Sequence, residues 1–173
     1  MNGTSAGPGT LVNRAPVFRI PRSGVAPLTF AAIAIGIARH FLDEYIRYTA
    51  PRKSRGIAVA ELMGTQAALG RAAGEVEAAS RLNRATAQEA MAPLAAGQPL
   101  TEAQRFESRC HAAIAAQMAL GAVQQLFNMA GGRTLYRTNA LQRLMRDMLG
   151  AASHYSLDWN VAAANYGRSL LKV

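Results

Sequence analysis

The chain is rich in alanine and poor in aromatic residues, and this limits the folds that it can form. Of its 173 residues 36 are Ala, whereas only 6% are Phe, Trp or Tyr. Alanine is the best helix former, and strands favour the β-branched and aromatic residues that are scarce here. Half of the residues are hydrophobic, which is enough to bury a core at this length. We therefore predict a single all-α domain of closely packed helices.

Helical spacing of apolar residues and helix-ending signals divide the chain into two parts. Residues 1–27 contain four prolines and are expected to form an extended leader or linker. Residues 28–173 are expected to form an antiparallel four-helix bundle with a short extra C-terminal helix. The expected helices are Leu28–Ala50, Ile57–Ala92, a third from Thr101 to the Gly131-Gly132 pair, Leu141–Gly150 and Trp159–Leu171.

The helix boundaries rest on local chemistry, and the buried faces rest on periodicity. Pro51 and Pro93 end the first two helices, and Thr101 with Gln104 forms a capping box for the third. Spacings of three and four define one expected buried face on each long helix. These faces are Phe30, Ile33, Ala34, Ile37, Phe41, Tyr45 and Tyr48; Leu62, Gln66, Leu69, Ala73, Val76 and Leu82; and Phe106, Cys110, Ala113, Gln117, Leu120, Gln124 and Phe127.

The basic balance of the chain does not point to nucleic acid as its main partner. Lys and Arg number 19 against 10 acidic residues, a net charge of +9. The basic residues are nearly all Arg and are scattered; Arg52, Lys53 and Arg55 form the densest cluster. The sequence has no stretch in which basic residues alternate with aromatic residues that could stack on bases.

The cysteine content indicates the compartment. A single Cys excludes an intrachain disulfide framework and favours a reducing, cytoplasmic compartment.

The N-terminal apolar run is too short to span a bilayer. Val25–Ala38 has 14 residues, whereas a transmembrane helix needs about 20. The first 42 residues carry four arginines and no acid, so a signal or transit segment is the alternative. The apolar pattern continues past Arg39 at helical spacing, and we therefore expect a buried helix and no membrane partner.

The C-terminal third holds the polar groups that could carry chemistry. Gly131, Gly132 and Arg133 would let a ligand approach the backbone closely beside a positive charge, or they would form an ordinary helix C-cap. Arg143 and Asp147 are spaced to form an exposed ion pair. Arg146 lies on another face, free to reach a phosphate or a partner chain.

His154 is the candidate catalytic residue. A loop histidine can act as a general base, and Asp158, four residues on, could fix its tautomer. In the competing interpretation Asp158 is only the N-cap of the last helix. Cys110 and His111 are adjacent and point about 100° apart on a helix, so both are expected to be packing residues. No metal-ligand spacing, P-loop or dinucleotide fingerprint is present.

The order of motifs in this third resembles the C-terminal domain of the acyl-CoA dehydrogenase superfamily. It is most similar to the flavin-dependent monooxygenase branch, the oxygenase components of two-component hydroxylases. The segments that carry the resemblance are Gly131–Tyr136, Leu141–Asp147 and His154, with weaker support from Val17–Pro21, Gly36–Arg39 and Tyr166–Leu171.

The resemblance implies a flavin cofactor, FMN or FAD, and a homo-oligomer built on the bundle. It places Gly131, Gly132, Arg133 and Arg146 near the flavin and His154 near its reactive edge and the substrate. Arg52–Gly56 with Gln66 resembles a segment that touches cofactor across a dimer, although the spacing is longer here.

The same family also has an N-terminal helical domain and a central β-domain, which this sequence does not match. We expect a truncated product, a fragment or one part of a split enzyme with the missing β-domain as partner. The leading hypothesis is a flavoprotein bundle domain that has little or no activity alone. The alternative is a non-catalytic oligomerisation module, and a basic nucleic-acid binder is a third, weaker hypothesis.

Overall fold

The computed structural model describes residues 9, 12–13, 15, 18 and 22–172, without the side chains of 22–25. Most of the expected leader, including Val17 and Pro21, lies outside the described residues. The described elements are α2 (Arg22–Thr49), β1 (Lys53–Ser54), β2 (Ile57–Ala58), η2 (Val59–Glu61), α3 (Met63–Ala95), α4 (Glu102–Met129), η3 (Gly132–Leu135), α5 (Ala140–Ala152), η4 (Tyr155–Leu157) and α6 (Trp159–Leu171).

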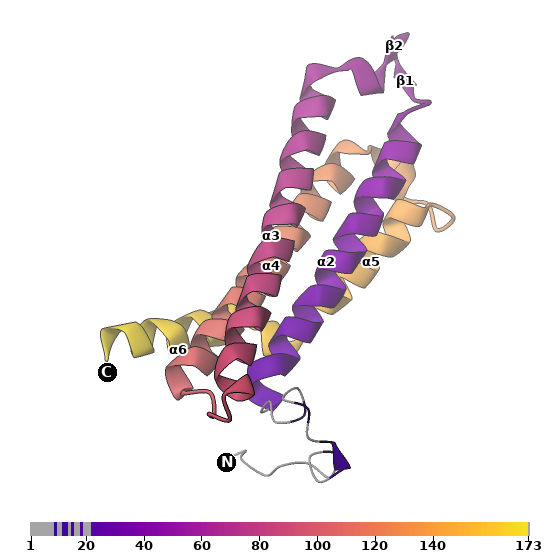
Figure 1. Cartoon of the computed structure of the whole chain (residues 1–173). Helices are drawn as coiled ribbons and strands as arrows, with labels where there is room; N and C mark the ends of the chain where they lie inside the picture. Colours follow the sequence, from indigo (N-terminus) through magenta and orange to yellow (C-terminus); the bar gives the residue numbers. More distant parts are fainter. Residues whose placement is uncertain (1–8, 10–11, 14, 16–17, 19–21, 173) are drawn as a thin grey trace.

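Four helices, α2 to α5, lie side by side, and α6 projects sideways from one end (Figure 1). Every pair among them except α3 and α5 is in substantial contact. The only sheet among the described residues is the hairpin formed by β1 and β2, each of which has two residues. The prediction of an all-α fold is therefore confirmed.

Helix α4 packs against all the other long helices and is buried mainly through alanines. Its buried residues are Ser108, Cys110, Ala112, Ala113, Ala115, Ala116, Ala119, Ala122, Val123 and Leu126. Small side chains let neighbouring helices approach α4 from several directions. The expected face was wrong at Gln117 and Gln124, which are exposed, because the alanines beside them take the core positions.

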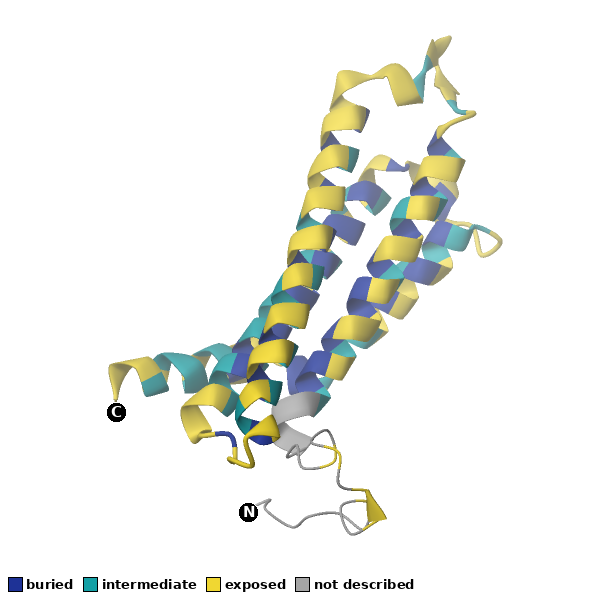
Figure 2. Ribbon diagram, in the orientation of Figure 1, coloured by how far each residue is buried: buried dark blue, intermediate teal, exposed yellow. Residues whose placement is uncertain are grey.

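Helix α2 supplies the largest buried side chains of the core, Phe41 and Tyr45. Ala34 is also buried as predicted, whereas Ile33 is 52% exposed and was wrongly assigned to the core. The segment Ala26–Thr49 is long and apolar enough to cross a membrane, so the length argument made from the 14-residue apolar run was wrong. Its buried residues belong to the core that α2 shares with α3, α4 and α5, and Figure 2 shows the buried positions on the inner faces of the ribbons.

Several helix boundaries differ from the sequence prediction. Helix α3 continues through Pro93 to Ala95, so Pro93 does not end it, because a proline in the last turn removes only one backbone hydrogen bond. Helix α2 begins at Arg22, so residues 22–27 are helical, because Pro27 removes only one backbone hydrogen bond near the helix start. Ile57 belongs to a β-hairpin, and α3 begins only at Met63. The hairpin forms because Arg55 (φ 51°) and Gly56 (φ 84°) adopt the left-handed conformation of a tight two-residue turn.

The buried face of α3 also differs from the expected one. Val76 is buried as predicted, but Leu62, Gln66 and Ala73 are exposed. The buried residues are Thr65, Ala68, Ala72, Val76, Ala79, Thr86, Ala90 and Leu94. Most of them recur three or four positions apart, so the helical spacing was predicted correctly, but most residues of the predicted face were not the buried ones.

The predicted caps on α4 and α6 are confirmed. Thr101 and Gln104 form the full capping box of α4, and Gly131, with φ 84°, follows the helix end. Asp158 caps α6, which spans Trp159–Leu171 as expected. These caps satisfy amides that would otherwise lack partners at the helix ends.

Candidate functional site

The candidate site residues lie at the two ends of α5 and do not form one cluster. Gly131, Gly132 and Arg133 precede the helix, and His154 follows it. Because α5 has 13 residues, its two ends are about 20 Å apart. The structure therefore presents a glycine turn, Gly131–Gly132, at one end, and the His154 turn, residues 154–157, at the other.

The glycine turn is an ordered helix end. The hydroxyl of Tyr48 donates to the carbonyl oxygen of Ala130 at 3.3 Å, and Thr134 Oγ1 donates to that of Gly131 at 2.7 Å. A Cβ atom built on Gly131 would lie 3.4 Å from Nη2 of Arg52, whereas one on Gly132 would meet no atom of the described residues within 4 Å. The C-cap interpretation is thus correct, and open space beside Gly132 also leaves room for a ligand.

Arg52 brings an unused hydrogen-bond donor to the glycine turn. Its guanidinium carbon lies 4.7 Å from the ring centre of Tyr48, a cation–π arrangement. Its Nη1 is buried and has no hydrogen-bond partner among the described residues, and the same is true of Thr49 Oγ1. Buried polar groups are normally paired. An anionic group such as a phosphate at the glycine turn would satisfy the Arg52 donor.

The arginines of α5 lie on the surface. Arg143, Arg146 and Asp147 are all exposed. Within the described part of the chain Arg143 and Asp147 do not form an ion pair, so that expected interaction is absent. Arg133 and Arg146 are exposed as a ligand or partner contact would require.

His154 is held from two directions. Its ring stacks on Phe30 of α2, with centroids 3.4 Å apart and planes 18° apart, and Tyr155 lies at 4.8 Å. Its Nδ1 accepts a hydrogen bond from the backbone N–H of Ser156 at 3.2 Å. Asp158 instead accepts from the Val161 amide. The idea that Asp158 fixes the tautomer of His154 is therefore wrong, and its competing role as N-cap is correct.

The hydrogen bond from Ser156 determines which nitrogen of His154 is left for chemistry. Because Nδ1 accepts an N–H, it carries no proton, and neutral His154 must hold its proton on Nε2. In this tautomer Nε2–H donates a hydrogen bond and cannot accept one. The geometry favours His154 as a hydrogen-bond donor through Nε2.

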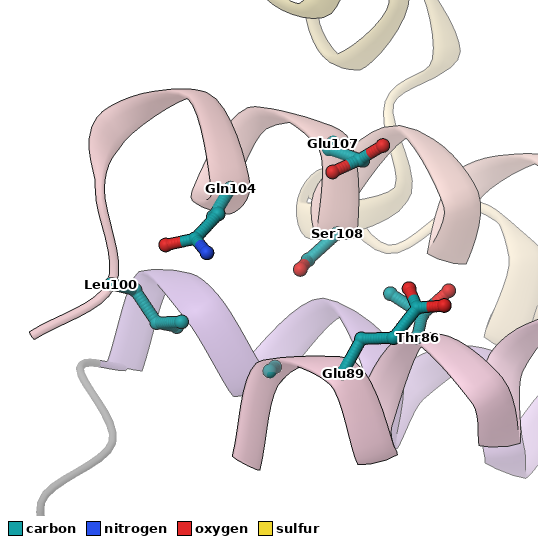
Figure 3. A pocket seen from close by; sticks show the side chains of 7 residues that line it. Thr86, Glu89, Leu100, Gln104, Glu107 and Ser108 are labelled. Carbon is teal, nitrogen blue, oxygen red and sulfur yellow. The ribbon is translucent and has the colours of Figure 1, made fainter. Parts of the chain in front are cut away.

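A polar cavity lies between α3 and α4, away from the predicted residues (Figure 3). Its volume is about 70 Å³, and its lining is Thr86, Glu89, Ala90, Leu100, Gln104, Glu107 and Ser108.

His111 and Cys110 of α4 lie near this cavity. The half-buried His111 contacts α3, since Thr86 Oγ1 lies 3.0 Å from its Nδ1, and this contact suits the expected packing role. Burial raises the pKa of the neighbouring Cys110 thiol and disfavours a nucleophilic thiolate.

Sequence reasoning missed the partners that shape both ends of α5. Phe30 and Tyr48 were assigned only to the core, and Ser156 was not noticed. Their contacts join segments far apart in the chain, and no local spacing marks them. Within the described residues no group of three or more His, Cys, Asp or Glu is placed to hold a metal ion.

Comparison with known proteins matches residues 28–159 to the family described as "Acyl-CoA dehydrogenase, C-terminal domain". The pigment production hydroxylase of Rhodococcus erythropolis is 31% identical over 139 residues, covering 80% of this chain and 35% of that protein. The oxygenase component of the FADH(2)-dependent resorcinol hydroxylase of Rhizobium sp. (strain MTP-10005) is 28% identical over 165 residues, covering 90% and 40%.

The fold is also that of a solved structure. The crystal structure of 3-HSA hydroxylase from Rhodococcus sp. RHA1 superposes with a TM-score of 0.86 at 24% identity, over 96% of this chain and 44% of that one. The chain thus spans less than half the length of these relatives. These matches confirm the resemblance carried by the segment from Gly131 to His154.

Proposed function

The chain belongs to the acyl-CoA dehydrogenase C-terminal domain family, and from that membership we propose that it forms the helical wall of the flavin site in a flavin-dependent monooxygenase. The observation that carries the proposal is the guanidinium of Arg52: its Nη2 lies beside Gly131, and its buried Nη1 has no hydrogen-bond partner among the described residues. A guanidinium donor in that position suits the phosphate of a flavin nucleotide.

The residues at the glycine turn would hold the phosphate end of the cofactor. Arg52 would donate from its guanidinium, Gly132 would allow close approach of the backbone, and Arg133 and Arg146 would add positive charge. We propose FAD over FMN because one relative is named as FADH(2)-dependent. When bound and reduced, the flavin supplies the electrons that activate oxygen for hydroxylation.

His154 would serve the reacting end of the site. Its Nδ1 is occupied by the Ser156 amide, so Nε2–H is the group offered to substrate or cofactor. We propose that it donates a hydrogen bond to an oxygen atom there and stabilises developing negative charge. The stack on Phe30 keeps the ring in one plane, which such a donor requires.

Flavin binding by the chain tests the proposal. Fluorescence titration with FAD should show weak, saturable binding, and Arg52→Ala should weaken it by about ten- to a hundredfold, since a charge-assisted hydrogen bond contributes about 1.5–3 kcal/mol. The control is Arg84→Ala, which removes an exposed arginine of α3 outside the segments that resemble cofactor contacts and should change affinity less than twofold. Absence of saturable binding, or equal binding by the Arg52 variant, would refute the proposal.

Activity is expected to require more than this chain, because it matches less than half of each relative. We propose that purified chain with reduced flavin and oxygen produces little or no hydroxylated product from a phenolic substrate. Turnover that His154→Ala abolishes would overturn this prediction of inactivity.

We also propose a cytoplasmic location, because Cys110 is a buried free thiol and no second Cys is present in the sequence.

The second candidate function is a non-catalytic oligomerisation module. Helix α6 exposes Trp159, Val161, Leu170 and Leu171, and an open groove of about 400 Å³ lies beside Trp159. Exposed apolar residues of this kind favour association with another copy or a partner domain. Light scattering after size-exclusion chromatography separates the functions: dimers or tetramers that form without flavin and never bind it favour the structural role.

A further inference from the structure

A single arginine links the central helix to the His154 turn. Arg109 of α4 donates from Nε to the carbonyl oxygen of Ser156 at 3.2 Å and from Nη2 to that of Tyr155 at 3.0 Å. These carbonyls belong to the two residues that directly follow His154. The half-buried guanidinium therefore bridges two adjacent peptide groups from outside the turn.

The geometry of this contact suits a rigid hold on the turn. The guanidinium is planar, and its donors point in fixed directions, so two simultaneous bonds define both the place and the tilt of the peptide pair. The turn is otherwise short: η4 has only three residues, and its closing bonds join His154 O to Leu157 N at 2.8 Å and Tyr155 O to Asp158 N at 3.2 Å. A turn of this length has few bonds of its own to resist distortion.

The amide of Ser156 connects the arginine to the imidazole. The N–H of Ser156 is the donor to His154 Nδ1, while the carbonyl of the same residue accepts from Arg109. A peptide group is planar, so fixing the Tyr155 carbonyl also orients the Ser156 N–H that shares its peptide plane. The bond from Arg109 Nη2 to Tyr155 thus aims the amide that sets the tautomer of His154.

We propose that Arg109 is a positioning residue that holds His154 in the tautomer with the proton on Nε2. The inference rests on the proposed role of His154, but the hydrogen bonds from Arg109 to the His154 turn do not require a flavin. Loss of Arg109 frees the Tyr155–Ser156 peptide to rotate, so Nδ1 loses its donor and both neutral tautomers become populated. The Nε2 donor is then present in only part of the molecules.

The test uses the nitrogen-15 spectrum of His154 in the full chain without flavin. Long-range proton–nitrogen spectra above the titration range of histidine distinguish the two tautomers, and His154→Gln assigns the signal among the three histidines of the chain. The wild type should show the tautomer with the proton on Nε2. Arg109→Ala should show a mixture, with hydrogen exchange of the Ser156 amide about tenfold faster.

Two further variants separate positioning from stability. Arg105→Ala removes a half-buried arginine one turn earlier on α4, one that makes no side-chain hydrogen bond to a described residue, and it should leave the His154 signal unchanged. Arg109→Lys keeps the positive charge but cannot make both hydrogen bonds of the planar guanidinium. It should give a tautomer mixture between those of the wild type and Arg109→Ala. It also tests the proposal if Arg109→Ala fails to fold. A wild-type tautomer and exchange rate in a folded Arg109 variant, whatever its melting temperature, would overturn the proposal.

Discussion

The imidazole of His154 lies face to face on the phenyl ring of Phe30, with centroids 3.4 Å apart. This stack ties the C-terminal loop to the start of the first long helix. Phe30→Leu removes the ring and keeps an apolar side chain. We expect the unfolding free energy to fall by about 0.5–1.5 kcal/mol, the value of an aromatic pair. We also expect the His154 ring protons to move downfield as the ring current of Phe30 is lost.

The matched control for Phe30 is Phe106→Leu on α4. Phe106 is half-buried like Phe30, but it pairs with no aromatic ring among the described residues. Its replacement should leave the His154 resonances in place. Unchanged His154 shifts in Phe30→Leu would show that the stack does not form in solution.

Gly131 and Gly132 are adjacent but should respond differently to alanine. Gly131 has φ 84°, and an added Cβ would approach Arg52 Nη2 at 3.4 Å, whereas Gly132 has open space. We expect Gly131→Ala to lower the unfolding free energy by about 1–2 kcal/mol because an L residue is strained there. Gly132→Ala should be neutral or slightly stabilising. Urea denaturation measures both, and equal effects would contradict the conformation of the glycine turn.

The alanines of α4 should not tolerate enlargement at the core. Ala116 is fully buried, so Ala116→Leu inserts three carbon atoms where neighbouring helices meet. We expect the unfolding free energy to fall by about 1–3 kcal/mol or more. Ala103→Leu, at an exposed position of the same helix, is the control and should cost less than about 0.5 kcal/mol. Equal melting temperatures for the two variants would show that α4 is not the packed centre.

Features with a local chemical cause were predictable from the sequence. The capping box of Thr101 and Gln104 marks the start of α4, and Asp158 marks the start of α6. Each signal lies within a few residues of the boundary it creates, and no distant contact is needed to produce it. Gly131 marked the end of α4 for the same reason, since only glycine adopts its positive φ without strain.

The buried faces were less predictable because the helices have little contrast between their faces. In α4, alanines surround Gln117, so several faces satisfy the same apolar spacing. Packing against α2 and α3 then selects the face with the smallest residues. The candidate site depends still more on distant contacts. Arg109 reaches Tyr155, and Phe30 reaches His154, across long stretches of sequence that carry no periodic signal.

The hydrogen bond between α6 and α4 predicts a pH dependence of stability. The hydroxyl of Tyr166 donates to Glu107 Oε1 at 3.0 Å. That bond, together with desolvation and the nearby carboxylate charge, raises the pKa of Tyr166. Its contribution to stability is therefore fully present below the unfolded tyrosine pKa of about 10 and is lost as pH rises through the folded pKa. The unfolding free energy should fall more steeply above about pH 10 in the wild type than in Tyr166→Phe, measured by urea denaturation across that range. Glu107→Gln, which removes the carboxylate charge, should also flatten the slope, and identical slopes in all three proteins would contradict the contribution of this bond.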